Sequence, residues 1–149
     1  IHEPGAAACE QLLGTTTIGW LGCARDNQPY IVPISIYFDP HARCLYSFAT
    51  VGQKIDWMRG NPRVCVAVDE VADPFNWTTV LVTGRYEELV ETGVDGGPSA
   101  RALELFQRNP DFWLPGAGRL AFGDDRDTPV VYRITIDQLT GRRAARRQP

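Results

Sequence analysis

The chain has 149 residues, of which 44% are hydrophobic and 22% charged, and its formal net charge is −3. This length suits one domain with one hydrophobic core, so we expect a single domain over residues 1–149. The net negative charge gives no general attraction to nucleic acid, and no apolar run approaches the roughly 20 residues of a membrane-spanning helix. Residues 1–8 lack the basic start and long apolar stretch of a secretory signal. We therefore expect a cytoplasmic protein that binds neither nucleic acid nor membranes.

The cysteines and histidines do not have the spacing of a metal site. The four cysteines are widely separated: Cys9, Cys23, Cys44 and Cys65. No Cys-x-x-Cys pair occurs and only two histidines accompany them, so zinc-ligand spacing is absent and we expect four free thiols and no metal. His2 and His41 lie in a terminal segment and a turn, where neither is a good general base. The catalytic residues are therefore left unassigned.

Hydrophobic periodicity divides the chain into short elements, mostly strands. In chain order we expect a helix over 6–13, strands over 18–24, 30–38 and 44–50, a helix over 52–59, strands over 63–71 and 77–89, a helix over 98–108 and a strand over 129–136. Six strands with few helices indicate a mainly β fold, a six-stranded barrel. An N-terminal helix and tail (1–14) and a basic C-terminal tail (142–149) complete it.

Glycines and a proline inside the expected strands indicate special backbone geometry. Gly19, Gly22 and Gly84 cost stability in strands unless the backbone coils sharply or another backbone approaches closely. Pro33 cannot donate to a ladder, so it indicates an edge, a bulge, or backbone that is left free to face something other than a strand. A ligand would satisfy the last condition.

One segment, residues 45–59, runs from a strand through Gly52 into the N-terminus of a helix. The first N–H groups of a helix lack partners within it and carry the positive end of its dipole, so this junction suits a phosphate. Thr50 and Gln53 are the expected donors. Lys54, the only lysine among fifteen basic residues, is the expected countercharge. On spacing alone, Lys54 is better explained as a solvated helix residue.

Five ordered segments resemble a known family. They are QPYIVPIS (28–35), GQKIDWMRGNPRVCVAVD (52–69), WTTVLVTGRYEEL (77–89), FWLP (112–115), and YRITI through TGR (132–142). Together they resemble the flavin-binding split-barrel proteins related to pyridoxamine 5'-phosphate oxidase, in particular a small uncharacterised branch. The resemblance implies a six-stranded antiparallel split β-barrel of the FMN-binding type. It also implies a homodimer with one flavin mononucleotide (FMN) at each of two sites built from both subunits.

The resemblance further implies which residues hold the FMN. The isoalloxazine ring is expected to lie against Val32, Pro33, Ile34, Ser35, Ser47, Phe48 and Ala49. The phosphate is expected to meet Thr50, Gln53 and Lys54. Thr79 matches a position that often faces the flavin, and Trp77 or the other subunit's Trp113 is expected to cover the ring. Packing in the core or interface is the alternative explanation of both tryptophans.

Two departures from the family affect the expected function. Several relatives carry arginine where this chain has Gln53, so either the phosphate is held more weakly or another arginine supplements it. The segment 140–147 does not reproduce the basic C-terminal pattern with which the true oxidases hold their substrate phosphate. Oxidation of vitamin B6 is therefore not assigned.

We expect an FMN-dependent oxidoreductase that acts on a small molecule without a recognisable signature in this sequence. In such a protein the cofactor supplies the redox chemistry, so no side chain need be catalytic. A nicotinamide nucleotide is the candidate electron donor. Two alternatives keep the same barrel: a reductase that uses the deazaflavin F420, and a non-catalytic flavin carrier, sensor or haem-binding module.

Overall fold

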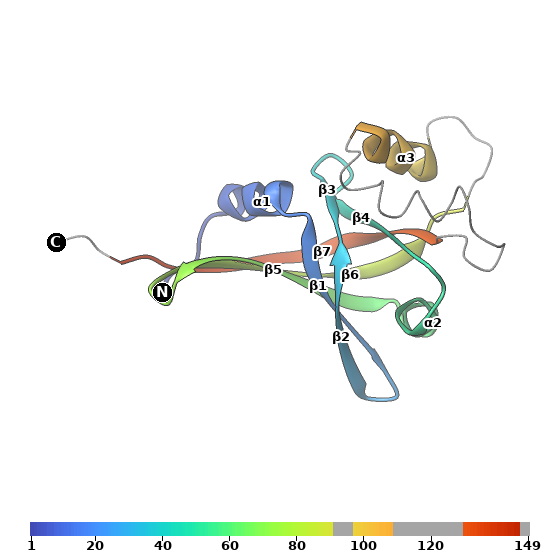
Figure 1. Ribbon diagram of the computed structural model, residues 1–149, viewed down its shortest axis with the longest axis horizontal. Helices are drawn as coiled ribbons and strands as arrows, with labels where there is room; N and C mark the ends of the chain where they lie inside the picture. Colours follow the sequence, from blue (N-terminus) through green and yellow to red (C-terminus); the bar gives the residue numbers. More distant parts are fainter. Residues whose placement is uncertain (91–96, 109–129, 147–149) are drawn as a thin grey trace.

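The computed structural model describes residues 1–90, 97–108 and 130–146. Its elements are α1 (Ala6–Thr15), β1 (Ile18–Arg25), β2 (Gln28–Ser35), β3 (Tyr37–Asp39), β4 (Cys44–Ala49), α2 (Gln53–Gly60), β5 (Arg63–Asp73), β6 (Asn76–Glu88), α3 (Pro98–Arg108) and β7 (Val130–Ala144). The strands form one antiparallel sheet in the order β2-β1-β5-β6-β7-β4-β3 (Figure 1). The mainly β fold with three helices is confirmed.

The two end strands of this sheet, β2 and β3, are consecutive in the chain. β2 pairs with β1 up to Ser35, whereas β3 begins at Tyr37 and pairs with β4. Only Ile36 separates them, and its N–H donates to the Thr17 carbonyl oxygen at 2.9 Å. The single strand expected over 30–38 is therefore two strands, which is why the sheet has seven strands rather than the expected six. The two ends of the sheet consequently meet at Ile36.

The main hydrophobic core lies on the inner face of the sheet. Alternate residues of the strands fill it, and α1 and α2 add Leu13, Ile55 and Met58, each at most 1% exposed. A second cluster lies on the outer face of β4, where α3 packs through Leu105 and Phe106. The inner face of the sheet is thus shielded from water, and α3 covers the outer face at β4.

The glycines inside the strands stand where other groups approach closely. A Cβ atom at Gly84 would collide with the carbonyl oxygen of Thr135, and one at Gly22 would lie 2.7 Å from the Cys65 sulfur. Gly84 also lies at the register shift between β6 and β7. The expected close approach of another backbone is confirmed at Gly84, whereas the close neighbour of Gly22 is a side chain.

Strand β7 is longer than expected. It continues past Ile136 to Ala144 and pairs with β6 from Tyr132 to Ala144, apart from the register shift at Asp137. Arg143 also exchanges two backbone hydrogen bonds of 2.9 Å with His2. Arg142, Arg143 and Ala144 therefore belong to the sheet, so the expected tail from 142 is wrong for these three residues.

Two hairpins extend away from the core (Figure 1): β1–β2, and the outer halves of β5 and β6 together with the end of β7. All four cysteines are free. In the described part of the chain no helix is long and apolar enough to cross a membrane. Nor do the described residues contain a cluster of three or more His, Cys, Asp or Glu suited to a metal ion.

Candidate functional site

β2 and the end of β4 are not paired with each other. β4 pairs with β3 only as far as Tyr46, and β2 pairs with no described strand other than β1. The two free edges diverge from one hydrogen bond, in which the Ser47 hydroxyl donates to the Ser35 carbonyl oxygen at 2.5 Å. Figure 1 shows β2 running into its hairpin while β4 turns towards α2. Backbone polar groups on these edges lack a strand partner, so this split offers hydrogen bonds to a ligand.

Helix α2 lies across the wide end of the split. Its N-terminus follows β4 through a short turn at Gly52, and its buried residues Ile55 and Met58 attach it to the core. Its Trp57 ring lies 5.6 Å from the ring of Tyr30 on β2. The helix therefore connects both sides of the split.

The N-terminus of α2 has free hydrogen-bond donors that suit an anion. Gly52 is its N-cap residue and supplies no side-chain hydrogen bond, so the first N–H groups of the helix lack a side-chain acceptor. Lys54 is half-buried and forms no ion pair with a carboxylate of the described residues. Thr50 is half-buried beside it and Gln53 is exposed. The three expected phosphate residues thus lie together at one positively polarised corner.

A second cation of α2 is already neutralised. Arg59 donates from Nε and Nη2 to the two carboxylate oxygens of Glu88 on β6, at 2.9 and 2.7 Å. The Tyr86 hydroxyl lies 3.2 Å from the same carboxylate. The bond to Arg59 lowers the pKa of Glu88 more than burial raises it. This pairing fixes the end of α2 and leaves Lys54 as the available charge of the helix.

The expected ring-contact residues on the two strands point in different directions. Ile34, Ser47 and Ala49 are 5%, 0% and 9% exposed and belong to the interior. Their side chains are therefore buried, and only their backbone groups border the split. The Phe48 ring packs at 5.8 Å against Phe106 of α3.

Three other expected contacts, all on β2, have less buried side chains. Val32 packs against the core and is partly buried. Pro33 and Ser35 are the ladder partners of Trp20 and Ile18 on β1, both of which have exposed side chains on the outer face.

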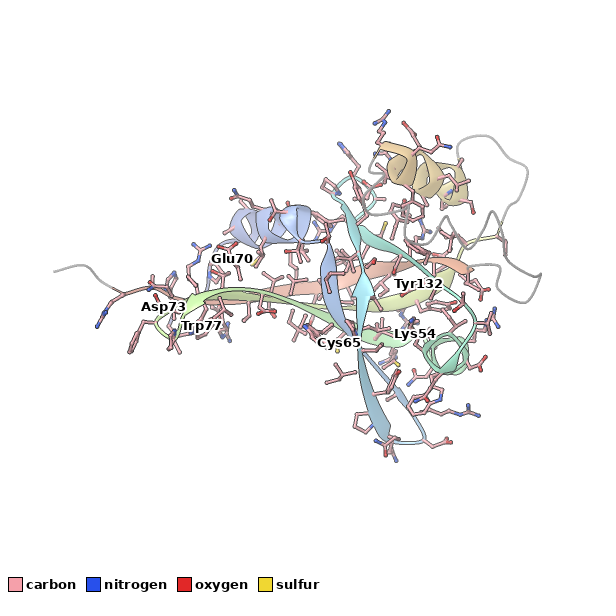
Figure 2. The ribbon with its side chains drawn as sticks, in the orientation of Figure 1. Lys54, Cys65, Glu70, Asp73, Trp77 and Tyr132 are labelled. Carbon is pink, nitrogen blue, oxygen red and sulfur yellow. The ribbon has the colours of Figure 1, made fainter. Side chains whose placement is uncertain are left out.

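Trp77 and Thr79 lie far from the α2 corner. They pair with Val71 and Asp69 near the free end of the β5–β6 hairpin. Figure 2 shows Trp77 beside Asp73 at the projecting end of the sheet, with Lys54 at the other end. One chain therefore does not bring these two expected groups of site residues together. Trp113 lies outside the described residues.

One polar group behind the split was not anticipated. Tyr132, the ladder partner of Ser47, is fully buried, and its hydroxyl forms no hydrogen bond of good geometry with the described residues. Burial raises its pKa to about 12, although the adjacent Ser47 side chain offsets part of the rise. The hydroxyl is therefore protonated at neutral pH and remains a donor. An aromatic residue at an inward position of a strand otherwise indicates only core.

A family model and a related sequence each match most of this chain. The family model described as pyridoxamine 5'-phosphate oxidase matches residues 5–143. An uncharacterised protein of Rhizobium meliloti (strain 1021) is 36% identical over 138 residues, which cover 91% of this chain and 90% of that protein.

Solved structures agree with this match. A FAD-binding protein from Mesorhizobium loti is 35% identical, with 97% of each chain covered and a TM-score of 0.75. The FAD-binding protein from Mycobacterium smegmatis is 21% identical, with 97% of this chain and 98% of that chain covered, and its TM-score of 0.67 shows a shared fold. Since the family match extends from the residue before α1 to the penultimate residue of β7, this chain belongs to the pyridoxamine 5'-phosphate oxidase family.

Proposed function

We propose that this protein is a flavin-binding oxidoreductase whose cofactor lies in the split between β2 and the β4–α2 segment. The observation that carries the proposal is the uncapped N-terminus of α2, with half-buried Lys54 lacking a carboxylate partner among the described residues. Two strand edges with free backbone groups lead to this corner from the Ser35–Ser47 hydrogen bond. A bound flavin supplies hydride and electron transfer chemistry.

The residues of the chain bind and orient the cofactor. Lys54 and the first N–H groups of α2 hold the phosphate that follows the ribityl chain. The free edges of β2 and β4 offer backbone donors and acceptors to the polar rim of the ring. The Arg59–Glu88 pair keeps α2 in place. No side chain is assigned a proton-transfer role, and the substrate is proposed only as a small molecule, with a nicotinamide nucleotide as the electron donor.

The family comparison favours FAD over the FMN expected from the sequence. The Mesorhizobium loti protein, which is 35% identical over 97% of this chain, is described as FAD-binding. FMN and FAD share the ring and the first phosphate, so the role proposed for Lys54 is the same with either. The F420 reductase and the non-catalytic flavin or haem module stay as alternatives. The absorption spectrum and the mass of the released cofactor distinguish all of them.

We also propose that the protein is a homodimer whose two sites each use residues of both chains. The support is the separation of Trp77 and Thr79 from Lys54 within one chain, together with an exposed apolar patch on the outer face of the sheet. This outer patch consists of Ile18 (53% exposed), Trp20 (49%), Val71 (61%) and Leu81 (43%). A second chain that covers the patch would bring its own Trp77 towards the split.

The test of the flavin proposal is the substitution Lys54→Ala. The loss of a charged hydrogen bond costs about 1.5–3 kcal/mol, so the dissociation constants of FMN and FAD should rise about ten- to a hundredfold. Riboflavin, which has no phosphate, should bind both forms equally. Lys54→Arg should retain most of the affinity. Fluorescence titration measures all three ligands, and failure of the wild-type protein to bind any flavin would overturn the proposal.

A further inference from the structure

The outer patch borders a groove on the same face of the sheet, and Trp20 belongs to both. The groove has a volume of about 800 Å³ and is lined by residues of β1, β2, β5, β6 and β7. Gly22 and Ala24, the next two residues of β1 on the side of Trp20, form a hollow in it. The indole ring, 49% exposed, therefore stands beside a hollow of small residues on one strand. Such a surface fits a second copy of itself when the two copies of β1 run in opposite directions.

The outward side chains of β5 carry opposite charges at its two ends. Arg63 and Asp69 are both exposed. The valines that alternate with the outward positions between them are buried in the core: Val64, Val66 and Val68. Arg63 and Asp69 are six residues apart, or about 20 Å along the strand. Neither side chain forms an ion pair with the described residues.

Two arginines stand side by side at one end of this face. Arg85 on β6 is the direct ladder partner of Arg63, and its side chain is also exposed. No carboxylate of the described residues lies within ion-pair distance of Arg85. Like charges directly opposite each other in a sheet are destabilising. A carboxylate from a second molecule would remove this repulsion.

Strand β7 carries its charges in the reverse order. The register shift between β6 and β7 leaves Asp137 as an extra residue, and it lines the same groove as the two arginines. Arg142 lies in the ladder row of Asp69, since both pair with Thr79. Its side chain is 55% exposed and pairs with Glu3, which is itself 75% exposed. Both β5 and β7 thus present opposite charges at their two ends to a reversed copy of the same strand.

We propose that a second copy of this chain covers the groove, around a two-fold axis that lies between the two sheets and crosses their strands roughly at right angles. Packed sheets keep their strand directions within about 30° of each other, so this axis sets each strand against its own reversed copy. With the axis midway between Arg63 and Asp69, Arg63 of each chain meets the partner's Asp69. At that level of β1, Trp20 enters the hollow over the partner's Gly22. The inference rests on the proposed homodimer and assigns its contacts.

An axis that runs along the strands fits these residues less well. It would keep each ladder row against the same row of the partner. The row of Arg63 and Arg85 would then face the partner's arginines, and juxtaposed like charges oppose association. Trp20 would also miss the hollow, which lies in the next two outward rows of β1.

The reversed arrangement brings together the separated parts of the proposed flavin site. On β6 the axis lies level with Val82, the ladder partner of Val66. Trp77, five residues before Val82, therefore faces the partner's β6 near Glu87. The next residue, Glu88, holds α2 through its two hydrogen bonds from the helix. The partner's Trp77 thus reaches the end of the sheet where α2 lies, which one chain alone does not achieve (Figure 2).

Charge reversal at two positions tests the ion pair. Arg63→Asp and Asp69→Arg should each raise the dimer dissociation constant about tenfold or more, because each opposes like charges at both symmetric contacts. The double variant Arg63→Asp/Asp69→Arg should recover the wild-type value, and a mixture of the two single variants should form heterodimers, because opposite charges then meet again. Arg108→Asp, on α3 away from the groove, is the control and should leave the dimer unaltered. Sedimentation velocity and native mass spectrometry measure these species.

Engineered cysteines test the direction of the axis. A Cys65→Ser background leaves only buried native cysteines. Thr79 and Arg85 are six residues apart on β6, about 20 Å, yet the proposed axis sets Thr79 of one chain opposite the partner's Arg85. A short bifunctional maleimide should therefore join Thr79→Cys chains to Arg85→Cys chains in a mixture, and should join neither chain to itself.

The outcomes separate this arrangement from the proposals on which it rests. A monomeric wild type would overturn both the homodimer and the arrangement. A wild-type dimer that the single reversals leave intact, or a double variant as weak as the single variants, would overturn the arrangement alone. Linkage of Arg85→Cys chains to each other would show an axis along the strands. If the dimer behaves as expected and binds no flavin, the arrangement stands and the flavin proposal fails.

Discussion

At the scale of single residues, Asp39 is a buried carboxylate whose contacts with the described residues all stabilise the fold. Its Oδ1 accepts hydrogen bonds from the N–H groups of His41 and Ala42 at 3.1 and 3.3 Å. Its Oδ2 accepts one from Arg101 of α3 at 3.3 Å and lies 3.5 Å from the Tyr46 hydroxyl. Burial raises the pKa of Asp39, but these donors together lower it by more than burial raises it. The pKa of Asp39 therefore lies below its ordinary value. The carboxylate therefore fixes the turn after β3 and anchors α3.

The lowered pKa of Asp39 predicts how stability depends on pH. A carboxyl whose pKa is lower in the folded state stabilises the protein above its unfolded pKa of about 3.9 and loses this contribution as pH falls through the folded pKa. Asp39→Asn should lower the free energy of unfolding at pH 7 by about 1.5–3 kcal/mol. Its stability should then fall less steeply than that of the wild type below about pH 4. Urea denaturation at several pH values measures both effects, and parallel pH profiles would contradict the assignment.

At the scale of elements, contiguous segments were predictable and cross-strand features were not. Helix α2 and its uncapped N-terminus, where we propose that the phosphate binds, depend on adjacent residues, so the pattern from Thr50 to Lys54 predicted the helix start. The division at Ile36 is a change of strand partner that leaves the hydrophobic pattern intact. The bulge at Asp137 shifts the alternation by one residue and so hid the second half of β7. Arg63 and Arg85 are 22 positions apart in the numbering, and only the register of β5 and β6 joins them.

The Arg59–Glu88 contact predicts a measurable coupling between α2 and β6. The geometry is bidentate, but the side chains are 43% and 30% exposed, so water screens the pair. A double-mutant cycle with Arg59→Ala and Glu88→Gln should give a small favourable coupling free energy. The more exposed pair Arg43–Glu10, 54% and 36% exposed, is the matched control and should couple less. Flavin affinity should fall several-fold in Arg59→Ala, and an unchanged affinity would show that α2 needs no such anchor.

At the scale of the whole molecule, the inner and outer faces of the sheet differ in how far they are buried. The inner face is buried by its own side chains, α1 and α2, whereas the outer face of β1, β5 and β6 carries the outer patch without cover from the described residues. Contiguous exposed apolar side chains typically mark an interaction surface. The β5–β6 hairpin that carries Trp77 continues this surface beyond the core (Figure 2). A self-complementary contact around a two-fold axis would bury the patch on both copies at once.

The substitution Leu81→Asp tests this arrangement, because Leu81 is 43% exposed in the centre of the outer face and contributes nothing to the core. A charge there should leave the fold intact and split the dimer, since a buried unpaired carboxylate at an interface costs several kcal/mol. Light scattering should show the wild type as a dimer and the variant as a monomer at micromolar concentration. Val90→Asp, at a site 65% exposed just after β6, is the control and should stay dimeric. Flavin affinity should fall in the monomer, because Trp77 and Thr79 then no longer reach the split from the partner. A monomeric variant that binds flavin as tightly as the wild type would show that each chain holds its cofactor alone.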